Sequence, residues 1–227
     1  DKENRKVAFT VFVDPGRRTY VRRINISGNT KTRDEVIRQE MRQMEGGWYD
    51  DERVKLSRQR IDKTDYFSEV NVETPPVPGT TDQVDVNVAV TEKSTGSVSV
   101  GAGYSQSEGV ILSGAISQSN IFGSGKYVSL QVGTGKINRA IGIGYTNPYF
   151  TDDGVSLGYN LSWRELVYPD FNTAQYNSTN GAAQVILGVP ITENDLVSVM
   201  FGIDKNQITT YSGYTPQKIR SEEHTSE

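Results

Sequence analysis

Polar and apolar residues alternate strictly over residues 95–105, and this short stretch divides the chain into two parts of different character. Its apolar positions are Val98, Val100, Ala102 and Tyr104. Serine and glycine occupy the positions between them, which places a continuous apolar face opposite a small, polar one. A run of about ten residues with this pattern is typical of a strand that crosses a bilayer as part of a β-barrel. The pattern therefore predicts that a membrane wall begins here and that a soluble unit precedes it.

Six further runs with the same period of two follow before residue 217. Their apolar positions are Leu112 and Ile116; Val128, Leu130 and Val132; Ile141, Ile143 and Tyr145; Val155, Leu157, Tyr159, Leu161 and Trp163; Ala183, Val185, Leu187 and Val189; and Val197, Val199, Phe201 and Ile203. Ser, Gly, Asn and Gln occupy nearly all positions between them, as the wet interior of a barrel requires. The sequence predicts seven antiparallel membrane strands, of which the second has the least regular pattern.

The connections between these runs agree in part with an outer-membrane barrel, whose external loops are long and whose periplasmic turns are short. If the preceding unit is periplasmic, the fifth connection, residues 164–178, is external and long, and the sixth, residues 190–195, is internal and tight. The first and third connections are also external but short. Aromatic residues gather where bilayer interfaces are expected: Tyr104, Phe122, Tyr145, Tyr149, Phe150, Trp163 and Tyr168.

The part before residue 95 alternates between strand and helix patterns. Strands are predicted at residues 20–27, 68–74 and 84–90, and helices at residues 32–44 and from residue 50 to about residue 65. The order strand, helix, helix, strand, strand (β-α-α-β-β) predicts a small α+β domain in which two helices cover one face of a three-stranded sheet.

Local signals bound both predicted helices. Thr32 and Glu35 have the spacing of a capping box, and Gly46-Gly47 is expected to stop the first helix. The run Asp50-Asp51-Glu52 places acidic residues at the positive end of the second. The positions expected to be buried are Val36, Ile37, Met41, Met44, Val54 and Ile61, with the small residues Ser57 and Thr64 on the face of the second helix that approaches the sheet.

An alternating run at the start of the chain matches the last strand of this domain. Its residues Val7, Phe9, Val11 and Val13 correspond to Val84, Val86, Val88 and Val90 at an offset of 77 residues. A tandem repeat whose earlier copy is cut off at residue 1 explains the match. The chain is therefore expected to begin inside a larger protein.

The distribution of charge and glycine supports two domains in different solvents. Residues 1–94 contain 34 charged side chains and 5 glycines, whereas residues 95–227 contain 18 charged side chains and 17 glycines. The net charge of −4 argues against a nucleic-acid partner, for which a basic domain is expected. No run of eighteen apolar residues occurs, so no membrane-spanning helix is predicted.

Catalytic chemistry has little support in the sequence, and neither an enzyme, a cofactor nor a metal site is predicted. The chain has no cysteine, and its one histidine is His224. The pairs Gly125-Lys126 and Gly135-Lys136 lack the other residues of a phosphate loop. Adjacent carboxylates at residues 50–51 and 152–153 are better explained as a helix start and a turn.

Several motifs resemble the BamA family, the central outer-membrane proteins of the bacterial β-barrel assembly machinery. They are Tyr20-Val-Arg-Arg-Ile24; Gly28-Asn29; Arg38-Gln-Glu-Met-Arg-Gln-Met-Glu45-Gly46; Val77-Pro-Gly79 with Asp82-Gln-Val-Asp-Val86; and Thr146-Asn-Pro-Tyr-Phe-Thr-Asp-Asp-Gly-Val-Ser-Leu157. The resemblance extends to about residue 217 and implies a Gram-negative source.

The resemblance also implies a division of the chain. Residues 1–16 are expected to end one periplasmic POTRA domain and residues 20–93 to form the next, which is the last before the barrel. Residues 95–217 are expected to be the first seven of sixteen barrel strands, so the barrel is incomplete. Residues 219–227 match neither the family nor a strand pattern and are expected to be a non-native tail.

The family's function implies partners and site residues. A barrel-assembly factor folds and inserts unfolded outer-membrane protein clients into outer-membrane lipid, and it works with BamD and other Bam lipoproteins. Arg38 and Glu45 occupy positions where the family contacts BamD, although ordinary solvated charges are the plainer explanation. The first strand is expected to form a lateral seam that templates client strands; its residues are Gly96, Ser97, Val98, Ser99, Val100, Gly101, Ala102, Gly103 and Tyr104.

Other readings of the sequence remain open at this stage. The glycines of the first strand also suit barrel curvature or a crowded interior. A related POTRA-barrel transporter that secretes protein shares the whole architecture. A passive porin is disfavoured by the charged unit in front of the strands, and a soluble β-rich adhesin would be extracted without detergent. An outer-membrane location, with the POTRA domains in the periplasm, is expected.

Overall fold

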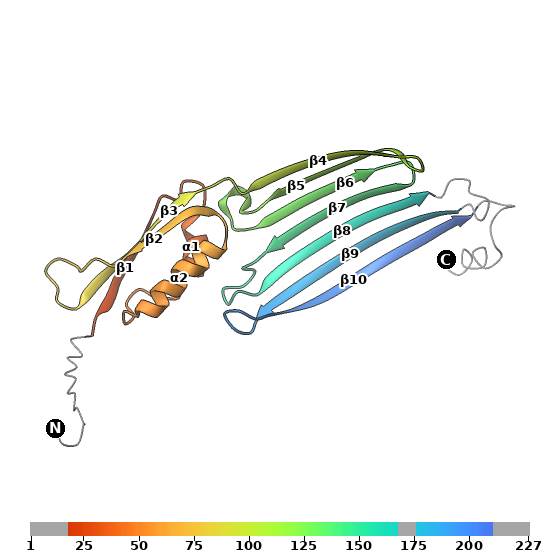
Figure 1. The fold of residues 1–227 in the computed structure, drawn as a ribbon. Helices are drawn as coiled ribbons and strands as arrows, with labels where there is room; N and C mark the ends of the chain where they lie inside the picture. Colours follow the sequence, from red (N-terminus) through yellow and green to blue (C-terminus); the bar gives the residue numbers. More distant parts are fainter. Residues whose placement is uncertain (1–17, 168–175, 211–227) are drawn as a thin grey trace, which may run out of the picture.

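The computed structural model describes residues 18–167 and 176–210, which fold into a small α+β domain and a seven-stranded sheet (Figure 1). The first domain contains β1 (Tyr20–Ser27), α1 (Asp34–Glu40), α2 (Asp51–Lys63), β2 (Phe67–Glu73) and β3 (Gln83–Glu92). The second contains β4 (Gly96–Ser105), β5 (Gly109–Gln118), the short helix η1 (Ile121–Gly123), β6 (Tyr127–Thr134), β7 (Asn138–Asn147), β8 (Ser156–Val167), β9 (Tyr176–Pro190) and β10 (Leu196–Thr210). Both the predicted α+β order and the seven predicted strands are confirmed.

The sheet of the first domain has the order β1-β3-β2, with β1 parallel to β3 and β2 antiparallel to it. Both helices lie on one face of this sheet (Figure 1). The valines at every second position of β3 point toward the helices, because side chains alternate across a strand. The buried core consists of Val21, Ile24, Ile37, Met41, Ile61, Phe67, Val70, Val86, Val88 and Val90. It is a core of mostly branched apolar side chains, as the sequence predicts.

The start of α2 agrees with its sequence signal. Asp50 is the N-cap, and its carboxylate accepts hydrogen bonds from the backbone N–H groups of Glu52 and Arg53. These bonds satisfy donors that have no partner inside the helix. Ser57 and Ile61 are fully buried against the sheet.

The first helix is shorter than predicted and is capped differently. It ends at Glu40, because Met41 adopts an extended conformation with φ −73° and ψ 135°. Its N-cap is Arg33, which makes no side-chain cap, so the capping box expected from Thr32 and Glu35 does not form. The expected stop at Gly46-Gly47 is likewise wrong.

A loop over residues 41–50 replaces the missing helical turn. Gly46 donates its N–H to the carbonyl of Val21 at 2.7 Å, and Gly47 accepts from the N–H of Val21 at 2.9 Å. The side chain of Gln43, which is 1% exposed, bonds three backbone groups of the same loop. Backbone pairing with β1 therefore competes with the helix and wins. As a result Met44 is exposed rather than buried.

The second sheet is antiparallel throughout, and its strands follow chain order from β4 to β10. The register aligns like with like across all seven strands. One row of directly paired residues is Val98, Ile116, Leu130, Ile143, Leu161, Ala183 and Ile203. The neighbouring row on the opposite face is Ser97, Ser117, Ser129, Gly144, Asn160, Gln184 and Gly202. The sheet therefore has one apolar face and one small, polar face.

The apolar face of this sheet is open. Val100 is 85% exposed and Ile203 is 78% exposed, and no helix or second sheet lies over the face in Figure 1. A soluble protein rarely leaves so large an apolar surface exposed, whereas a membrane wall presents such a face to lipid. Within the described residues, no helix is both long and apolar enough to span a membrane.

Several expectations concern the strand ends and segments beyond the described residues. The long connection predicted at residues 164–178 is shorter, because β8 continues to Val167 and β9 begins at Tyr176. The intervening residues, with Tyr168, lie outside the described ranges, as do the expected domain end at residues 1–16 and the tail at residues 219–227. The tight turn at residues 190–195 is confirmed.

Candidate functional site

The α+β domain is joined to the sheet by more than the short linker between β3 and β4. The loop between β5 and β6 lies against the start of α1, where the side-chain amide of Asn120 donates to the Thr32 hydroxyl at 2.8 Å. The backbone N–H of Arg33 donates to the carbonyl of Gly123 at 3.0 Å. Tyr66, at the end of the helical segment, donates its hydroxyl to the carbonyl of Gly125 at 3.1 Å. These bonds hold the sheet against one end of the domain.

Close backbone approach at this contact requires glycine. Gly123 has φ +69°, and a Cβ atom there would lie 1.8 Å from the carbonyl oxygen of Lys31. Neither the conformation nor the space suits another residue. The sequence Gly125-Lys126 belongs to the same contact, because Gly125 also has positive φ and faces Val36. Its glycine thus has a structural reason.

A buried carboxylate organises the segment that meets this loop. Glu92, the last residue of β3, accepts hydrogen bonds from the N–H groups of Lys31 and Thr32 and from the Thr30 hydroxyl. Burial acts to raise the pKa of Glu92, but the hydrogen bonds from Thr32 and Thr30 outweigh burial and lower this pKa to about 2. The charged carboxylate therefore fixes residues 30–32 against the end of the sheet.

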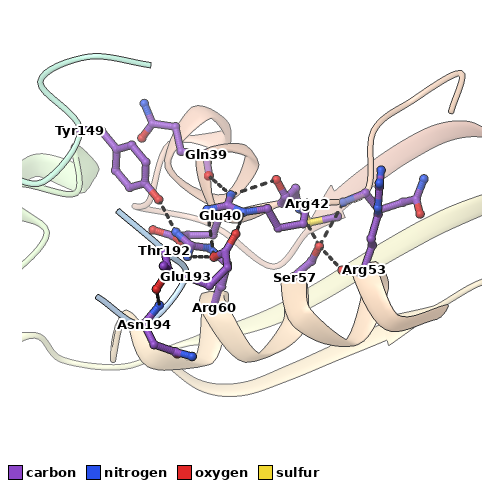
Figure 2. Close-up of polar contacts among 12 residues, drawn as sticks. Gln39, Glu40, Arg42, Arg53, Ser57, Arg60, Tyr149, Thr192, Glu193 and Asn194 are labelled. Atoms are coloured by element: carbon purple, nitrogen blue, oxygen red, sulfur yellow. Dashed lines mark hydrogen bonds and ion pairs between the residues drawn. The ribbon is translucent and has the colours of Figure 1, made fainter. Parts of the chain in front are cut away.

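A second contact, between the helices and the turn that joins β9 to β10, is an ionic cluster (Figure 2). Glu193 in this turn accepts from Nε of Arg42 at 2.7 Å and from Nη1 of Arg60 at 2.6 Å. Nη2 of Arg60 lies 2.9 Å from a carboxylate oxygen of Glu40 and 2.9 Å from the hydroxyl of Tyr149. Two arginines thus bridge α1, α2 and two turns of the sheet. We call Glu40, Arg42, Arg60, Tyr149 and Glu193 the junction cluster.

The electrostatics of the junction cluster favour its charged state. The hydrogen bond from Arg42 lowers the pKa of the Glu193 carboxyl, and the charge of Arg60 adds to the effect. Burial raises the pKa of the Tyr149 phenol, and Glu40 acts in the same direction. Because Arg60 and Glu40 are mostly shielded from solvent, their ion pair is stronger than a surface pair but leaves a costly charge if one partner is removed.

The sequence did not point to the junction cluster. Its acidic and basic members carry no local motif, and Glu193 is 151 residues from Arg42 and 133 from Arg60. The available indication was the tightness of the turn, which is stabilised by hydrogen bonds between Thr192 and Asp195. That indication places the turn but not its partners.

The predicted contact pair Arg38 and Glu45 is brought together. Nη1 of Arg38 lies 3.4 Å from Oε1 of Glu45. The same pair occupies the outer edge of β1: Ile24 donates its N–H to Glu45 at 2.8 Å, and Arg38 donates to the Ile24 carbonyl at 3.1 Å. Both side chains remain partly exposed. They are more than solvated charges, because they complete the hydrogen bonding of an edge strand.

The predicted lateral-gate strand, β4, is at one edge of the sheet. It pairs with β5 over its full length from Gly96 to Ser105, and no strand among the described residues pairs with its other side. A Cβ atom on Gly96 or Gly101 would approach the side chain of Gln118 or Ser113 to 2.6 Å, whereas one on Gly103 would meet nothing within 4 Å. Crowding therefore accounts for two of these glycines but not for the third.

Two family models and several known proteins match the chain. The model described as Omp85 superfamily domain matches residues 120–226, and the POTRA model, described as surface antigen variable number repeat, matches residues 19–93. Outer membrane protein assembly factor BamA of Neisseria meningitidis is 39% identical over 92% of this chain and 27% of its own length. BamA of Nitratidesulfovibrio vulgaris is 31% identical over 91% of this chain and 25% of its own length.

Solved structures agree with these matches. The crystal structure of BamA from Haemophilus ducreyi lacking POTRA domains 1–3 has a TM-score of 0.72 at 34% identity, covering 87% of this chain and 37% of that one. CdiB from Acinetobacter baumannii has a TM-score of 0.61 at 16% identity over 86% of this chain and 39% of its own. The likeness to CdiB concerns the fold alone.

A POTRA domain followed by an unclosed antiparallel sheet of Omp85 type defines the class, and the chain belongs to the Omp85 superfamily. Within this superfamily its similarity is to BamA, and it corresponds to a fragment that spans 27% and 25% of the two curated BamA proteins. This membership fits a location in the bacterial outer membrane with the POTRA domain in the periplasm, as predicted.

Proposed function

We propose that the full-length protein to which this chain corresponds folds and inserts β-barrel proteins into the outer membrane, with β4 as the template on which a client strand adds. Relatives that are named outer membrane protein assembly factors support the general role. The finer proposal is carried by one observation: the outer edge of β4 has no paired strand within the described residues.

The physical reason lies in the cost of unpaired backbone in lipid. Each N–H or C=O group without a hydrogen bond in hydrocarbon costs several kcal/mol. An edge strand that offers these groups in register satisfies an incoming strand by β-augmentation. β4 is suited to a seam that opens, because its glycines pack few side chains against a partner. Gly103 supports this reading, since there is room for a side chain at its position.

A reversible crosslink tests the template. In the full-length protein, a disulfide between a cysteine at Ser99 and the facing residue of the last barrel strand should abolish client insertion into proteoliposomes, and reduction should restore it. The control is a disulfide between Ser97→Cys and Ser117→Cys, which face each other on β4 and β5 with their hydroxyls 2.8 Å apart. This control leaves the outer edge of β4 free and should not affect insertion. Normal insertion with the first crosslink closed would refute the gate.

We also propose that Arg38 and Glu45 contribute to binding a BamD-type lipoprotein, and that other Bam lipoproteins complete the complex. Both side chains are partly exposed beside a loop with an exposed Trp48, which gives a protein partner charged and aromatic anchors. Glu45→Gln keeps an acceptor for the Ile24 N–H but removes the charge, so it separates binding from folding. Copurification of BamD should fall at least tenfold.

The control for this test is Glu35→Gln on the adjacent helix, an exposed carboxylate paired only with Arg33 among the described ion pairs. It should leave copurification unchanged. Equal recovery of BamD with Glu45→Gln, Glu45→Lys and the parent protein would remove the assignment.

A secretion transporter is the second candidate, supported by a shared fold with CdiB. It would bind an exported partner in place of a BamD-type lipoprotein. Crosslinking of the full-length protein in its native membrane distinguishes the two, because an assembly factor captures many different barrel proteins and a transporter captures one exported partner.

A further inference from the structure

The apolar face of the second sheet has a trough along β9. Two rows cross this strand: Trp163, Gly181 and Lys205 are directly paired, and so are Leu161, Ala183 and Ile203. In each row the middle residue is small and its neighbours are large. Large side chains on β8 and β10 therefore wall a depression whose floor is glycine and alanine.

The depression is a groove of about 580 Å³. Its lining includes Leu161, Trp163, Gly181, Ala183, Ile203 and Lys205. This volume lies within the range of about 300–1,000 Å³ that is usual for sites of small organic ligands. The groove lies on the face that lipid covers, so a flexible hydrocarbon chain is the occupant that its shape and polarity fit.

Lys205 marks the polar end of the groove. The next row toward the far end of the strands is polar and consists of Arg139, Glu165, Thr179 and Gln207. The apolar band thus ends at the level of Lys205, beside Trp163, an aromatic residue of the kind that gathers at bilayer interfaces. β10 runs from the junction turn at Leu196 away from the POTRA domain (Figure 1), so this level belongs to the leaflet remote from that domain.

The charge of Lys205 is not matched by the protein within the described part of the chain. Arg139, one row further out, has Glu165 at 3.5 Å. No such ion pair joins Lys205 to a carboxylate of residues 18–167 or 176–210. A lysine at this depth extends its ammonium toward the headgroups, where an anionic phosphate is the complementary group.

We propose that this groove binds one anionic, phosphate-bearing lipid of the leaflet remote from the POTRA domain. Its acyl chain lies along Gly181 and Ala183, and its phosphate is held by Lys205. The small residues of β9 select a chain by shape, and the lysine selects the headgroup by charge.

The groove offers a substitution that fills it without disturbing the strand. A Cβ atom on Gly181 meets nothing within 4 Å, so Gly181→Val adds bulk to the floor without a clash, and valine is favoured in strands. Gly114 is a matched control, because it is in the row of Val100 and Val132 on the same face and a Cβ there meets only the Ser99 carbonyl oxygen, at 3.9 Å. Gly114→Val therefore adds the same bulk outside the groove.

The experiment uses the full-length protein in nanodiscs of phosphatidylcholine with a minor fraction of phosphatidylglycerol. Native mass spectrometry counts the lipids retained after release from the disc. The parent protein and Gly114→Val should retain one phosphatidylglycerol in preference to phosphatidylcholine. Gly181→Val should retain at least tenfold less, and Lys205→Gln about fivefold less, the factor expected for one cation near a lipid surface.

Other outcomes overturn the proposal. Equal retention by Gly181→Val and Gly114→Val would show that the groove holds no lipid. Retention of phosphatidylcholine and phosphatidylglycerol in the proportions of the disc would show that no headgroup is selected. A photocrosslinker at Leu161 that captures a protein in native membranes in place of lipid would assign the groove to a protein partner. Heat-modifiable migration in electrophoresis verifies that each variant is folded.

Discussion

Nη1 of Arg60 in α2 lies 2.6 Å from Oε2 of Glu193, which belongs to the turn between β9 and β10. This ion pair connects the POTRA domain to the far end of the sheet from β4, whereas the Asn120 contact connects it near β5 (Figures 1 and 2). Two separated contacts define the angle between a domain and a sheet, which one linker alone leaves free. The junction cluster therefore sets where the POTRA domain lies relative to the barrel wall.

Loss of the Glu193 carboxylate should loosen this orientation. Glu193→Gln removes the charge that Arg42 and Arg60 share, and each remaining arginine keeps fewer partners. Because Glu193 is partly exposed, we expect a loss of about 1 kcal/mol in the docking free energy. Distance distributions between spin labels on the POTRA domain and on the barrel of the full-length protein should broaden. Asp153→Asn, in the neighbouring turn, is the control, and an equal broadening there would contradict the role of Glu193.

The Glu92 carboxylate should make the local stability depend on pH. Its pKa is about 2 in the folded protein and 4.5 ordinarily, so its contribution is present above pH 4.5 and is lost as the pH falls toward 2. Hydrogen exchange of the Lys31 and Thr32 amides, corrected for the intrinsic rate at each pH, should lose protection over this interval. In Glu92→Ala, protection should already be reduced at pH 7 by about 1–3 kcal/mol. A pH profile that is unchanged in Glu92→Ala would assign the effect to another group.

Gly123→Ala should separate the loop between β5 and β6 from the POTRA domain. The new methyl group would lie 1.8 Å from the Lys31 carbonyl oxygen, so the backbone has to move. Gly46→Ala is a matched control, because Gly46 also has positive φ but open space around its Cβ position. We expect about 1–2 kcal/mol for Gly46→Ala from the left-handed conformation alone and a larger loss for Gly123→Ala. Thermal unfolding of the full-length protein measures both, and equal losses would exclude the clash.

Gln43→Leu should disorder the loop that holds Glu45. The Gln43 side chain is buried and bonds the backbone of Met44, Trp48 and Asp50, so leucine leaves these groups without partners. We expect a loss of about 2–4 kcal/mol in the stability of the POTRA domain. Increased proteolysis within residues 41–50 of the full-length protein would show the change. Gln39→Leu, on α1, serves as the control, and cleavage of both variants at the same rate would contradict the role of Gln43.

Local patterns accounted for most of the secondary structure. The seven strands of the second sheet were predicted because alternation of side chains is a property of each strand by itself, and the paired row from Val98 to Ile203 confirms which face is apolar. The start of α2 was predicted for a similar reason, since Asp50 bonds amides only two and three residues away. In the candidate site, the sequence and the family resemblance together indicated Arg38, Glu45 and β4, whose roles as partner contact and gate stay predictions.

The end of α1 and the junction cluster depended on the tertiary structure. Residues 41–50 leave the helix because Val21, far away in the sequence, supplies their hydrogen bonds, and Thr32 bonds Asn120 where a helix cap was expected. Glu193 meets Arg42 and Arg60 across more than 130 residues. The sequence by itself determined which residues alternate and therefore which faces meet lipid, water or the core. Only the folded chain decided which distant groups pair, because hydrogen bonds and ion pairs depend on separation in space, and no local pattern encodes that separation.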